Sequence, residues 1–377
     1  MQQKPREIRM GVIGLGWPGI RHSEAVRKCA DARLCAAADL DESRRKEYQD
    51  LFPGTKVFSD YKEMIADNEI DAVIICLPNF LHSPVTLEAL RAGKHVLCEK
   101  PPALHAAEMR EIRDEAARRS LVYAFGRQMR FTESMRAARE IIDSGRLGEI
   151  YYARSSWVRS RGIPVGIGNW FIDREKAGGG AIIDIGIHAL DSAWYLMGNP
   201  DPTTVSASVS TRFRNHVPKG AKFDVDDSGF AFLRFGNGAV MQLEVTWAGN
   251  LTDDIPESDL WQRERISTVI YGEKASLRLD PLTLFEDRDG ELVDIPIEVE
   301  TGGRGFRRQM EDFVGAILLS GEPTNNAEQA VELMEMLDAI YESSARGREI
   351  VIAAEPVAEP ASNRAMPTAV AEGESFG

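Results

Sequence analysis

The sequence predicts an α/β protein in two parts. An N-terminal, doubly wound parallel sheet precedes a C-terminal α+β domain with an open-faced, mainly antiparallel sheet. Strand and helix signals alternate over the first 125 residues, and a glycine-rich turn at 14–19 links the first strand to the first helix. Strand signals after residue 200 follow one another with only short turns between them. Alternating strands and helices indicate a parallel sheet, whereas consecutive strands joined by turns indicate an antiparallel one.

The N-terminal half supplies short apolar runs that are typical of strands. They lie at 8–16, 32–41, 55–60, 71–78, 95–101 and 121–126. Helix signals lie between them at 17–30, 43–52, 61–70, 82–94 and 105–120. Pro53 and Gly54 end the second helix, and Gly93 lies near the end of the fourth. The run at 71–78 is continuously apolar, as expected for a parallel strand that is covered on both faces.

The C-terminal half begins with a helix near 132–145 and an alternating strand at 150–161. A glycine cluster at 178–180 precedes a helix at 182–198. Strand signals follow at 203–213, 227–249, 265–280 and 283–290, with the turn pairs Asn237-Gly238 and Asp289-Gly290 among them. Two helices, near 305–320 and 326–346, close the fold.

These patterns predict a first domain over residues 1–127 and a second domain over residues 128–350. The last segment, 351–377, is rich in Ala, Pro, Glu and Ser and has no apolar period, so we expect a disordered tail. Two domains fit the chain length of 377 residues.

Composition excludes several classes of protein. The chain has 45 Lys and Arg against 59 Asp and Glu, a net charge of −14, which disfavours binding to a nucleic acid backbone. No run of 18 apolar residues indicates a membrane span. The four cysteines, Cys29, Cys35, Cys76 and Cys98, lack metal-ligand spacing, so we expect no metal site and a reducing, cytoplasmic location.

The glycine-rich turn carries the first chemical signal. Gly14, Gly16 and Gly19 follow the pattern G-x-G-x-x-G between a strand and a helix, which is the Rossmann fingerprint of dinucleotide binding. Gly14 allows the tight turn, and Gly16 lets the backbone approach a pyrophosphate at the helix N-terminus. Leu15 lies in the same loop. Trp17 either covers the pyrophosphate or only packs against its neighbours.

Asp39 ends the second strand, 20 residues after Gly19. A carboxylate there accepts hydrogen bonds from the ribose 2′-OH of NAD and repels the 2′-phosphate of NADP. Asp41 is the better candidate for the cap of the next helix. We therefore expect NAD rather than NADP as cofactor, although Arg44 and Arg45 lie close enough in sequence to weaken the preference.

Three further segments, CLPNFLH at 76–82, AGKHVLCEKPPA at 92–103 and GGGAIIDIGIHALD at 178–191, identify a resemblance. Together with the glycine fingerprint they resemble the glucose–fructose oxidoreductase / inositol dehydrogenase family, Gfo/Idh/MocA. The resemblance runs from about residue 8 to residue 350. It implies a Rossmann domain followed by an open-faced substrate domain, in agreement with the pattern above.

The resemblance also implies site residues. The family's catalytic lysine falls on Lys100 of Glu99-Lys100-Pro101, and its aspartate and histidine fall on Asp184 and His188. Further positions near the cofactor are Leu77, Pro78, Asn79, His82, Glu99 and Gln128. Leu77 stands where many members have Thr. His82 either lines the site or caps the next helix.

The chemistry of these groups fits alcohol oxidation. Hydride transfer to a nicotinamide requires that the hydroxyl also loses its proton, and the protein must supply the base. Asp184 and His188 are four residues apart, so on an α-helix they share a face, and His188 is a natural general base. The carboxylate then either orients the imidazole or positions substrate. A cationic Lys100 at a strand end would stabilise a developing alkoxide.

Aromatic and basic residues at 155–171 point to the substrate. Trp157, Arg159 and Trp170 suit a sugar or polyol, and Arg159 with Arg161 would also suit an anionic sugar. Alternatively, these arginines lie on the solvent face of a strand. We expect the aspartates of the segment 223–230 to lie on the surface of the sheet.

The sequence therefore predicts an NAD(H)-dependent oxidoreductase acting on a secondary alcohol or ketone of a sugar, inositol or sugar derivative. An alternative in the same fold is a glycoside-cleaving enzyme that oxidises transiently and recycles its cofactor. A third is a nucleotide-sensing module without catalysis. The expected partners are a carbohydrate substrate and further copies of the chain in a homodimer or homotetramer, because the second sheet has apolar residues on both faces.

Overall fold

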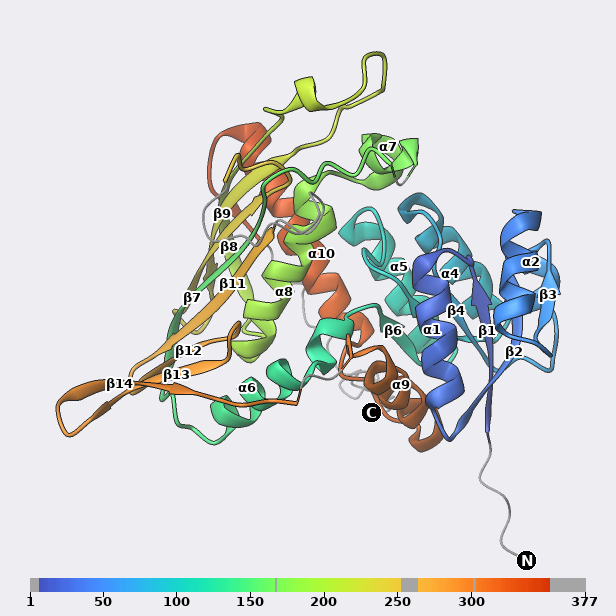
Figure 1. The fold of residues 1–377 in the computed structure, drawn as a ribbon, viewed down its shortest axis with the longest axis horizontal. Coiled ribbons are helices and arrows are strands. Elements are labelled where there is room, and N and C mark those ends of the chain that lie inside the picture. Colours follow the sequence, from blue (N-terminus) through green and yellow to red (C-terminus); the bar gives the residue numbers. More distant parts are fainter. Residues whose placement is uncertain (1–6, 167, 252–263, 301–302, 353–377) are drawn as a thin grey trace, which may run out of the picture.

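The computed structural model describes residues 7–166, 168–251, 264–300 and 303–352 (Figure 1). Two sheets lie on opposite sides of the molecule, and helices fill the space between them (Figure 1). The two-part α/β architecture predicted from the sequence is confirmed.

The first sheet is parallel and has the strand order β3-β2-β1-β4-β5-β6. Its strands are β1 Ile8–Ile13, β2 Ala32–Ala38, β3 Lys56–Phe58, β4 Ala72–Ile75, β5 His95–Cys98 and β6 Tyr123–Phe125. The connecting helices are α1 Trp17–Lys28, α2 Glu42–Leu51, α3 Tyr61–Ile65, α4 His82–Arg91 and α5 Ala106–Arg118. Strand β4 is buried along its whole length, as its apolar run predicted.

Strands β1 and β4 pair at the centre of this sheet. From β1 the chain adds β2 and β3 on one side, and from β4 it adds β5 and β6 on the other side, so the direction of the strand order reverses between β1 and β4. Ligands of doubly wound sheets bind beyond the carboxyl ends of the strands at such a point. The glycine turn follows β1, and the segment at 76–82 follows β4. The topology therefore brings these two motifs to one edge.

The second sheet has nine strands in the order β14-β13-β12-β11-β7-β10-β9-β8-β15. Every neighbouring pair is antiparallel except β7 with β10. The strands are β7 Ile150–Arg159, β8 Pro202–Ser210, β9 Ser228–Phe235, β10 Val240–Thr246, β11 Glu264–Gly272, β12 Ala275–Arg278, β13 Thr283–Arg288, β14 Glu291–Pro296 and β15 Ile350–Val351. The turn at Asp289 and Gly290, both with positive φ, joins β13 to β14 as expected.

Helices cover one face of the second sheet. A π-helical turn at Ile182–Gly186 leads into α8 Ile187–Leu196, which packs on β7, β10 and β11. Helix α10, Ala327–Arg346, lies between β8 and α5 and so joins the two halves (Figure 1). The remaining helices are α6 Glu133–Asp143, α7 Arg174–Ala177, α9 Phe306–Leu319 and the 3-10 turns η1 Asn79–Leu81, η2 Gln128–Phe131, η3 Asn169–Ile172 and η5 Arg214–His216.

Two features of the fold are not evident in the sequence. Helix α9 lies late in the chain, yet it packs on α1, and Phe306, Met310 and Phe313 share a core with β1. Strand β15 pairs with β8, so Val351 belongs to the sheet rather than to the expected tail. The rest of that expected tail, 353–377, lies outside the described residues. Within the described ranges, no helix is long and apolar enough to span a membrane.

Candidate active site

The glycine turn is built so closely that side chains would not fit at two of its positions. Gly14 has a φ of +91°, and a Cβ there would lie 2.3 Å from the carbonyl oxygen of Cys76. A Cβ on Gly19 would lie 2.0 Å from the carbonyl oxygen of Gly14. At Gly16 the nearest described atom to a Cβ is Cδ of Pro18 at 3.9 Å, so this position is open on the cavity side. Helix α1 begins at the next residue, which leaves its N-terminal amides available to a phosphate.

Asp39 fastens this turn to the end of β2. Its Oδ2 accepts a hydrogen bond from the amide of Leu15 at 2.8 Å, and its Oδ1 accepts one from the amide of Asp41 at 2.9 Å. Arg44 lies 3.7 Å from the same carboxylate. Asp41 caps α2 through the amides of Ser43 and Arg44, as predicted. The carboxylate of Asp39 is thus held beside the glycine turn, where a ribose would lie.

The segment after β4 is tied to the segment after β5 by His82. Its Nδ1 lies 2.6 Å from the carbonyl oxygen of Pro101, and its Nε2 lies 2.7 Å from that of Leu77. Asn79 donates to the carbonyl oxygen of Ala177, at the end of α7. His82 is the first residue of α4, but its ring binds these loops and does not cap the helix. It lines the cavity described below.

Glu99 anchors the backbone before the lysine. Its Oε1 lies 2.8 Å from Nε2 of His22, and its Oε2 accepts from the amide of Lys100 at 3.1 Å. Burial alone raises the pKa of Glu99, but the His22 contact and the charge of Lys100 outweigh burial, so this pKa lies below the ordinary glutamate value. Glu99 is therefore an ionised carboxylate, and it holds Lys100 through the backbone amide of that residue.

Lys100 and Asp184 form an ion pair across the two halves of the molecule. Nζ of Lys100 donates to Oδ1 of Asp184 at 3.0 Å and to its carbonyl oxygen at 2.9 Å. Oδ2 of Asp184 accepts from Nε1 of Trp247 at 3.0 Å and from Arg159 at 3.4 Å. Burial raises the pKa of Asp184, but the neighbouring cations and hydrogen bonds outweigh it and leave the pKa below the ordinary aspartate value.

The helix expected at 182–198 begins with a π-helical turn, so Asp184 and His188 lie in different helical segments. Asp184 lies in the π-helical turn at Ile182–Gly186, and His188 lies in α8 after it. Both residues are described, and no hydrogen bond joins them: Asp184 binds Lys100, and His188 binds Arg127.

His188 is buried beside Arg127 and Trp157. Its Nδ1 lies 2.6 Å from a guanidinium nitrogen of Arg127, and its ring lies 5.5 Å from that of Trp157. Burial holds the pKa of His188 well below 6.5, and the positive charges of Arg127, Lys100 and Arg159 lower the pKa further. The imidazole is therefore neutral at physiological pH.

Arg159, the last residue of β7, faces the site and not solvent. Arg159 bridges Asp184 and Glu264, with its Nε 3.0 Å from Glu264 Oε2. The indole nitrogen of Trp157 donates to the same glutamate oxygen at 2.8 Å. Of the two alternatives for Arg159, the solvent face is wrong. Arg161 donates to the carbonyl oxygen of Ser160.

A cavity of about 310 Å³ has Lys100, Asp184 and other predicted site residues in its wall. Predicted site residues in its wall are Gly16, Trp17, Leu77, Pro78, Asn79, His82, Glu99, Lys100, Trp170 and Asp184. The other predicted residues do not line it: Gly14, Leu15, Gly19, Asp39, Gln128, Trp157, Arg159 and His188. Gln128 begins η2, and its Oε1 is buried without a hydrogen-bond partner. Among the residues that the structure describes, no three His, Cys, Asp or Glu side chains are grouped to hold a metal ion.

Comparison with known proteins decides the family. Residues 8–127 match the model of the oxidoreductase family with an NAD-binding Rossmann fold, and residues 135–278 match the GFO/IDH/MocA C-terminal domain. The chain belongs to the GFO/IDH/MocA oxidoreductase family. The resemblance seen in the sequence is confirmed, as are the NAD-binding Rossmann domain and the assignment to oxidoreductases.

The similarity of this GFO/IDH/MocA protein to its relatives covers from 62% to 91% of the chain in two of them. It is 31% identical to the D-glucoside 3-dehydrogenase of Escherichia coli K12 over 91% of this chain and 97% of the relative. It is also 31% identical to the myo-inositol 2-dehydrogenase of Thermotoga maritima, over 62% of this chain and 66% of the relative. The solved structure of levoglucosan dehydrogenase in complex with NADH has a TM-score of 0.82 at 26% identity, covering 92% of this chain and 99% of that one.

Several residues that build the site of this GFO/IDH/MocA protein carry no signal in the sequence. Asp226 was expected on the sheet surface, but it is buried, and it accepts hydrogen bonds from the amides of Gly180 and Ile182 and from Tyr341. It thereby holds the start of the π turn that carries Asp184. Arg127, Trp247 and Glu264 contact the predicted residues from segments without a motif. The glycine at 180, where a Cβ would lie 1.7 Å from the carbonyl oxygen of Asp226, is the one nearby sequence feature that reflects the close packing around Asp226.

Proposed function

We propose that this protein is an NAD(H)-dependent oxidoreductase that exchanges hydride between nicotinamide and a secondary alcohol or ketone of a sugar, inositol or sugar derivative. The observation that carries the proposal is the cavity bounded at one end by Gly16 and at the other by the Lys100–Asp184 pair. A dinucleotide site and an acid–base pair in one cavity are what alcohol oxidation needs. The dehydrogenase names of the relatives support this class.

The residues fit NAD. The open position at Gly16 and the free amides of α1 would hold the pyrophosphate, and Asp39 would hold the adenosine ribose. The segment from Leu77 to Asn79 would lie against the nicotinamide end, with Gln128 as a further candidate. When bound, NAD accepts the hydride that leaves the carbon of the alcohol. The carboxylate of Asp39 supports NAD over NADP.

The hydroxyl proton is assigned to Lys100 and to the residues Asp184 and His188. Lys100 lies in the cavity wall with its Nζ fixed by Asp184, so it can hydrogen bond a substrate oxygen and carry a proton. Asp184 holds that lysine and stays ionised. His188 lies on α8 with its ring 5.5 Å from that of Trp157.

The charges favour a neutral substrate. Arg159 is paired with the carboxylates of Asp184 and Glu264, so it has no need of a substrate anion. Trp170 and Phe171 supply aromatic surface in the cavity wall, which suits the apolar face of a sugar ring. We therefore propose an uncharged sugar, polyol or glycoside as the substrate class.

The domain boundary, the location and the oligomeric state belong to the same proposal. We propose a division into domains at residues 127 and 128, a cytoplasmic location, and a homodimer or homotetramer. The sheet face away from α8 and α10 supports assembly, because Phe230 is 52% exposed there and Phe232 lies two residues further on the same strand.

The test is a screen of NAD and NADP reduction against neutral sugars, inositols, uronates and glycosides. We expect net NADH formation with a neutral member and little with the matching uronate. Lys100→Ala should abolish the signal, and Lys176→Ala, at an exposed lysine of α7, should not. Release of an aglycone without net NADH would instead establish the glycoside-cleaving alternative. Binding of NAD with no turnover of any member would favour a sensing module.

A further inference from the structure

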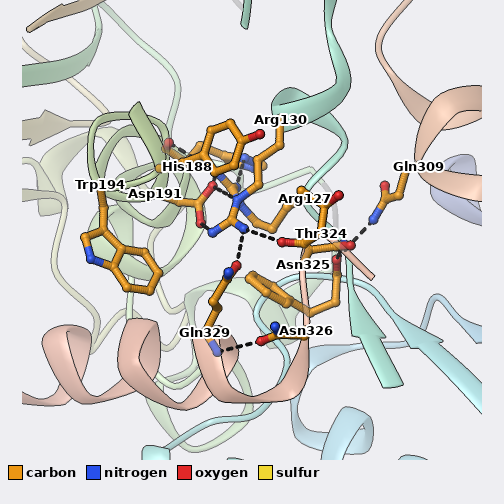
Figure 2. Close-up of polar contacts among 12 residues, drawn as sticks. Arg127, Arg130, His188, Asp191, Trp194, Gln309, Thr324, Asn325, Asn326 and Gln329 are labelled. Carbon is orange, nitrogen blue, oxygen red and sulfur yellow. Dashed lines mark hydrogen bonds and ion pairs between the residues drawn. The ribbon is translucent and has the colours of Figure 1, made fainter. Parts of the chain in front are cut away.

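Arg127 is fully buried between the two halves and faces the predicted catalytic histidine (Figure 2). One of its terminal nitrogens lies 2.6 Å from Nδ1 of His188, and the other donates to the carbonyl oxygen of His188 at 3.3 Å. A guanidinium has five N–H donors and no acceptor. The atom opposite it must therefore be an acceptor, so Nδ1 of His188 carries a lone pair and no proton.

A buried ionic cluster of Arg127, Arg130 and Asp191 holds the guanidinium of Arg127 in place (Figure 2). Asp191 accepts from Arg127 at 2.6 Å and from Arg130 at 2.5 and 3.0 Å, and all three side chains are fully buried. Arg130 also donates to the carbonyl oxygen of Thr324 at 3.0 Å. Two cations share one carboxylate in this cluster, so it opposes any further positive charge on the neighbouring imidazole.

We propose that Arg127 is a positioning residue that fixes His188 in the tautomer with its proton on Nε2. The proposal rests on the proposed function and deepens it. With its proton on Nε2, His188 can donate a hydrogen bond to a substrate oxygen and cannot remove a proton from it. Lys100 carries the proton: the amine form of its side chain accepts the hydroxyl proton during oxidation and so becomes the ammonium that pairs with Asp184, and this ammonium returns a proton to the oxygen during reduction.

The opposite assignment conflicts with the contact. For His188 to act as a general base, Nε2 would need a lone pair, and the proton of the neutral ring would lie on Nδ1. That N–H would point at an N–H of Arg127 across 2.6 Å, leaving two buried donors without acceptors. A doubly protonated ring meets the same donor and adds a charge beside Arg127, Lys100 and Arg159.

Solid-state 15N NMR of protein labelled at histidine reads the tautomer without any turnover. Because the chain has 6 histidines, the His188 signals are assigned by their loss in His188→Gln. We expect a non-protonated Nδ1 and a protonated Nε2 in the wild type and in Arg127→Lys. Arg127→Met should populate the other tautomer. Arg130→Met disturbs the same cluster but does not touch His188, so it should keep the wild-type pattern.

A protonated Nδ1 in the wild type would overturn the proposal even if the enzyme oxidises sugars. The expected tautomer in a protein that oxidises none would leave it standing and remove the proposed function instead. If Arg127→Met does not fold, the wild-type spectrum and the kinetic comparison below still decide the question.

Kinetics separate a donor from a base. The side-chain amide of Gln has an N–H at about the position of Nε2, but it cannot accept a proton. We expect His188→Gln to retain kcat within about tenfold of wild type and His188→Leu to lose about 10²-fold or more, the usual cost of a lost hydrogen-bond donor to an oxyanion. Equal losses in the two variants would show that His188 is the base and would overturn the proposal.

Discussion

Three donors, Lys100, Arg159 and Trp247, bind the carboxylate of Asp184. Lys100→Ala should lower kcat by about 10²-fold or more, as for a lost acid–base group. The affinity for NAD should change far less, because the glycine turn and not Lys100 holds the phosphates. Isothermal titration with NAD and steady-state kinetics measure the two effects.

A double-mutant cycle tests how Asp184 acts. Since Asp184 contacts Lys100, the variant with Lys100→Ala and Asp184→Asn should be no slower than Lys100→Ala alone. Asp184→Asn and His188→Leu touch separate partners, so their losses in kcat/KM should multiply. If the variant with both Asp184→Asn and His188→Leu lost no more kcat/KM than His188→Leu alone, the carboxylate of Asp184 would orient the imidazole of His188, contrary to the contacts described.

We propose that Asp39 sets the preference for NAD over NADP. Asp39→Ser removes a like charge from the position of the 2′-phosphate, which should narrow the preference for NAD by about fivefold to tenfold in kcat/KM. Arg44 lies 3.7 Å from this carboxylate and carries the opposite charge. Arg44→Ala should therefore widen the preference for NAD over NADP. A wild-type enzyme that turns over faster with NADP at equal subsaturating concentrations would refute the role of Asp39.

Which residues could be predicted follows from how local their signals are. Lys100, Asp39 and the glycine turn lie at strand ends, where topology alone brings ligand-binding residues together. Arg127 and Trp247 could not be assigned from the sequence, because each meets its partner from more than 60 residues away. No spacing rule connects such positions; only the packed fold does.

Among the elements, the π turn at Ile182–Gly186 is the main departure from the prediction. The apolar pattern of 182–198 indicates a helix, and a helix forms, but apolar periodicity does not register one extra residue in a turn. From this turn Asp184 binds Lys100, and from α8 His188 binds Arg127. The parallel first sheet and the open, mainly antiparallel second sheet were predicted, because alternating strand and helix signals favour the one and consecutive strands joined by short turns favour the other.

The start of this turn depends on Gly180. A Cβ there would lie 1.7 Å from the carbonyl oxygen of Asp226, so Gly180→Ala should destabilise the fold by about 3 kcal/mol or more and lower activity by displacing Asp184. Gly315 in α9 is a matched control: a Cβ there meets nothing within 4 Å, and Gly315→Ala should stabilise by up to about 1 kcal/mol. Thermal unfolding measures both, and equal stability of the two variants would contradict the packing described.

At the scale of the whole molecule, the second sheet leaves one face uncovered by α8 and α10 (Figure 1). Phe230 lies on that face, and the rings of Tyr152 and Tyr271 stack on it 5.0 Å apart. Light scattering at micromolar concentration should therefore give the mass of a dimer or tetramer. Phe230→Asp should lower this mass, whereas Leu319→Asp, at the exposed end of α9, should not. A monomeric wild type would refute the assembly.

The central claim is that hydride passes between the carbon of a sugar alcohol and nicotinamide in the cavity between Gly16 and Lys100. The direct measurement uses the sugar selected by the substrate screen, with deuterium on the carbon to be oxidised, and follows NADH and product by mass spectrometry. The account predicts NADH that carries one deuterium and an equimolar amount of keto sugar. Consumption of the sugar with no deuterium in any NADH would contradict it.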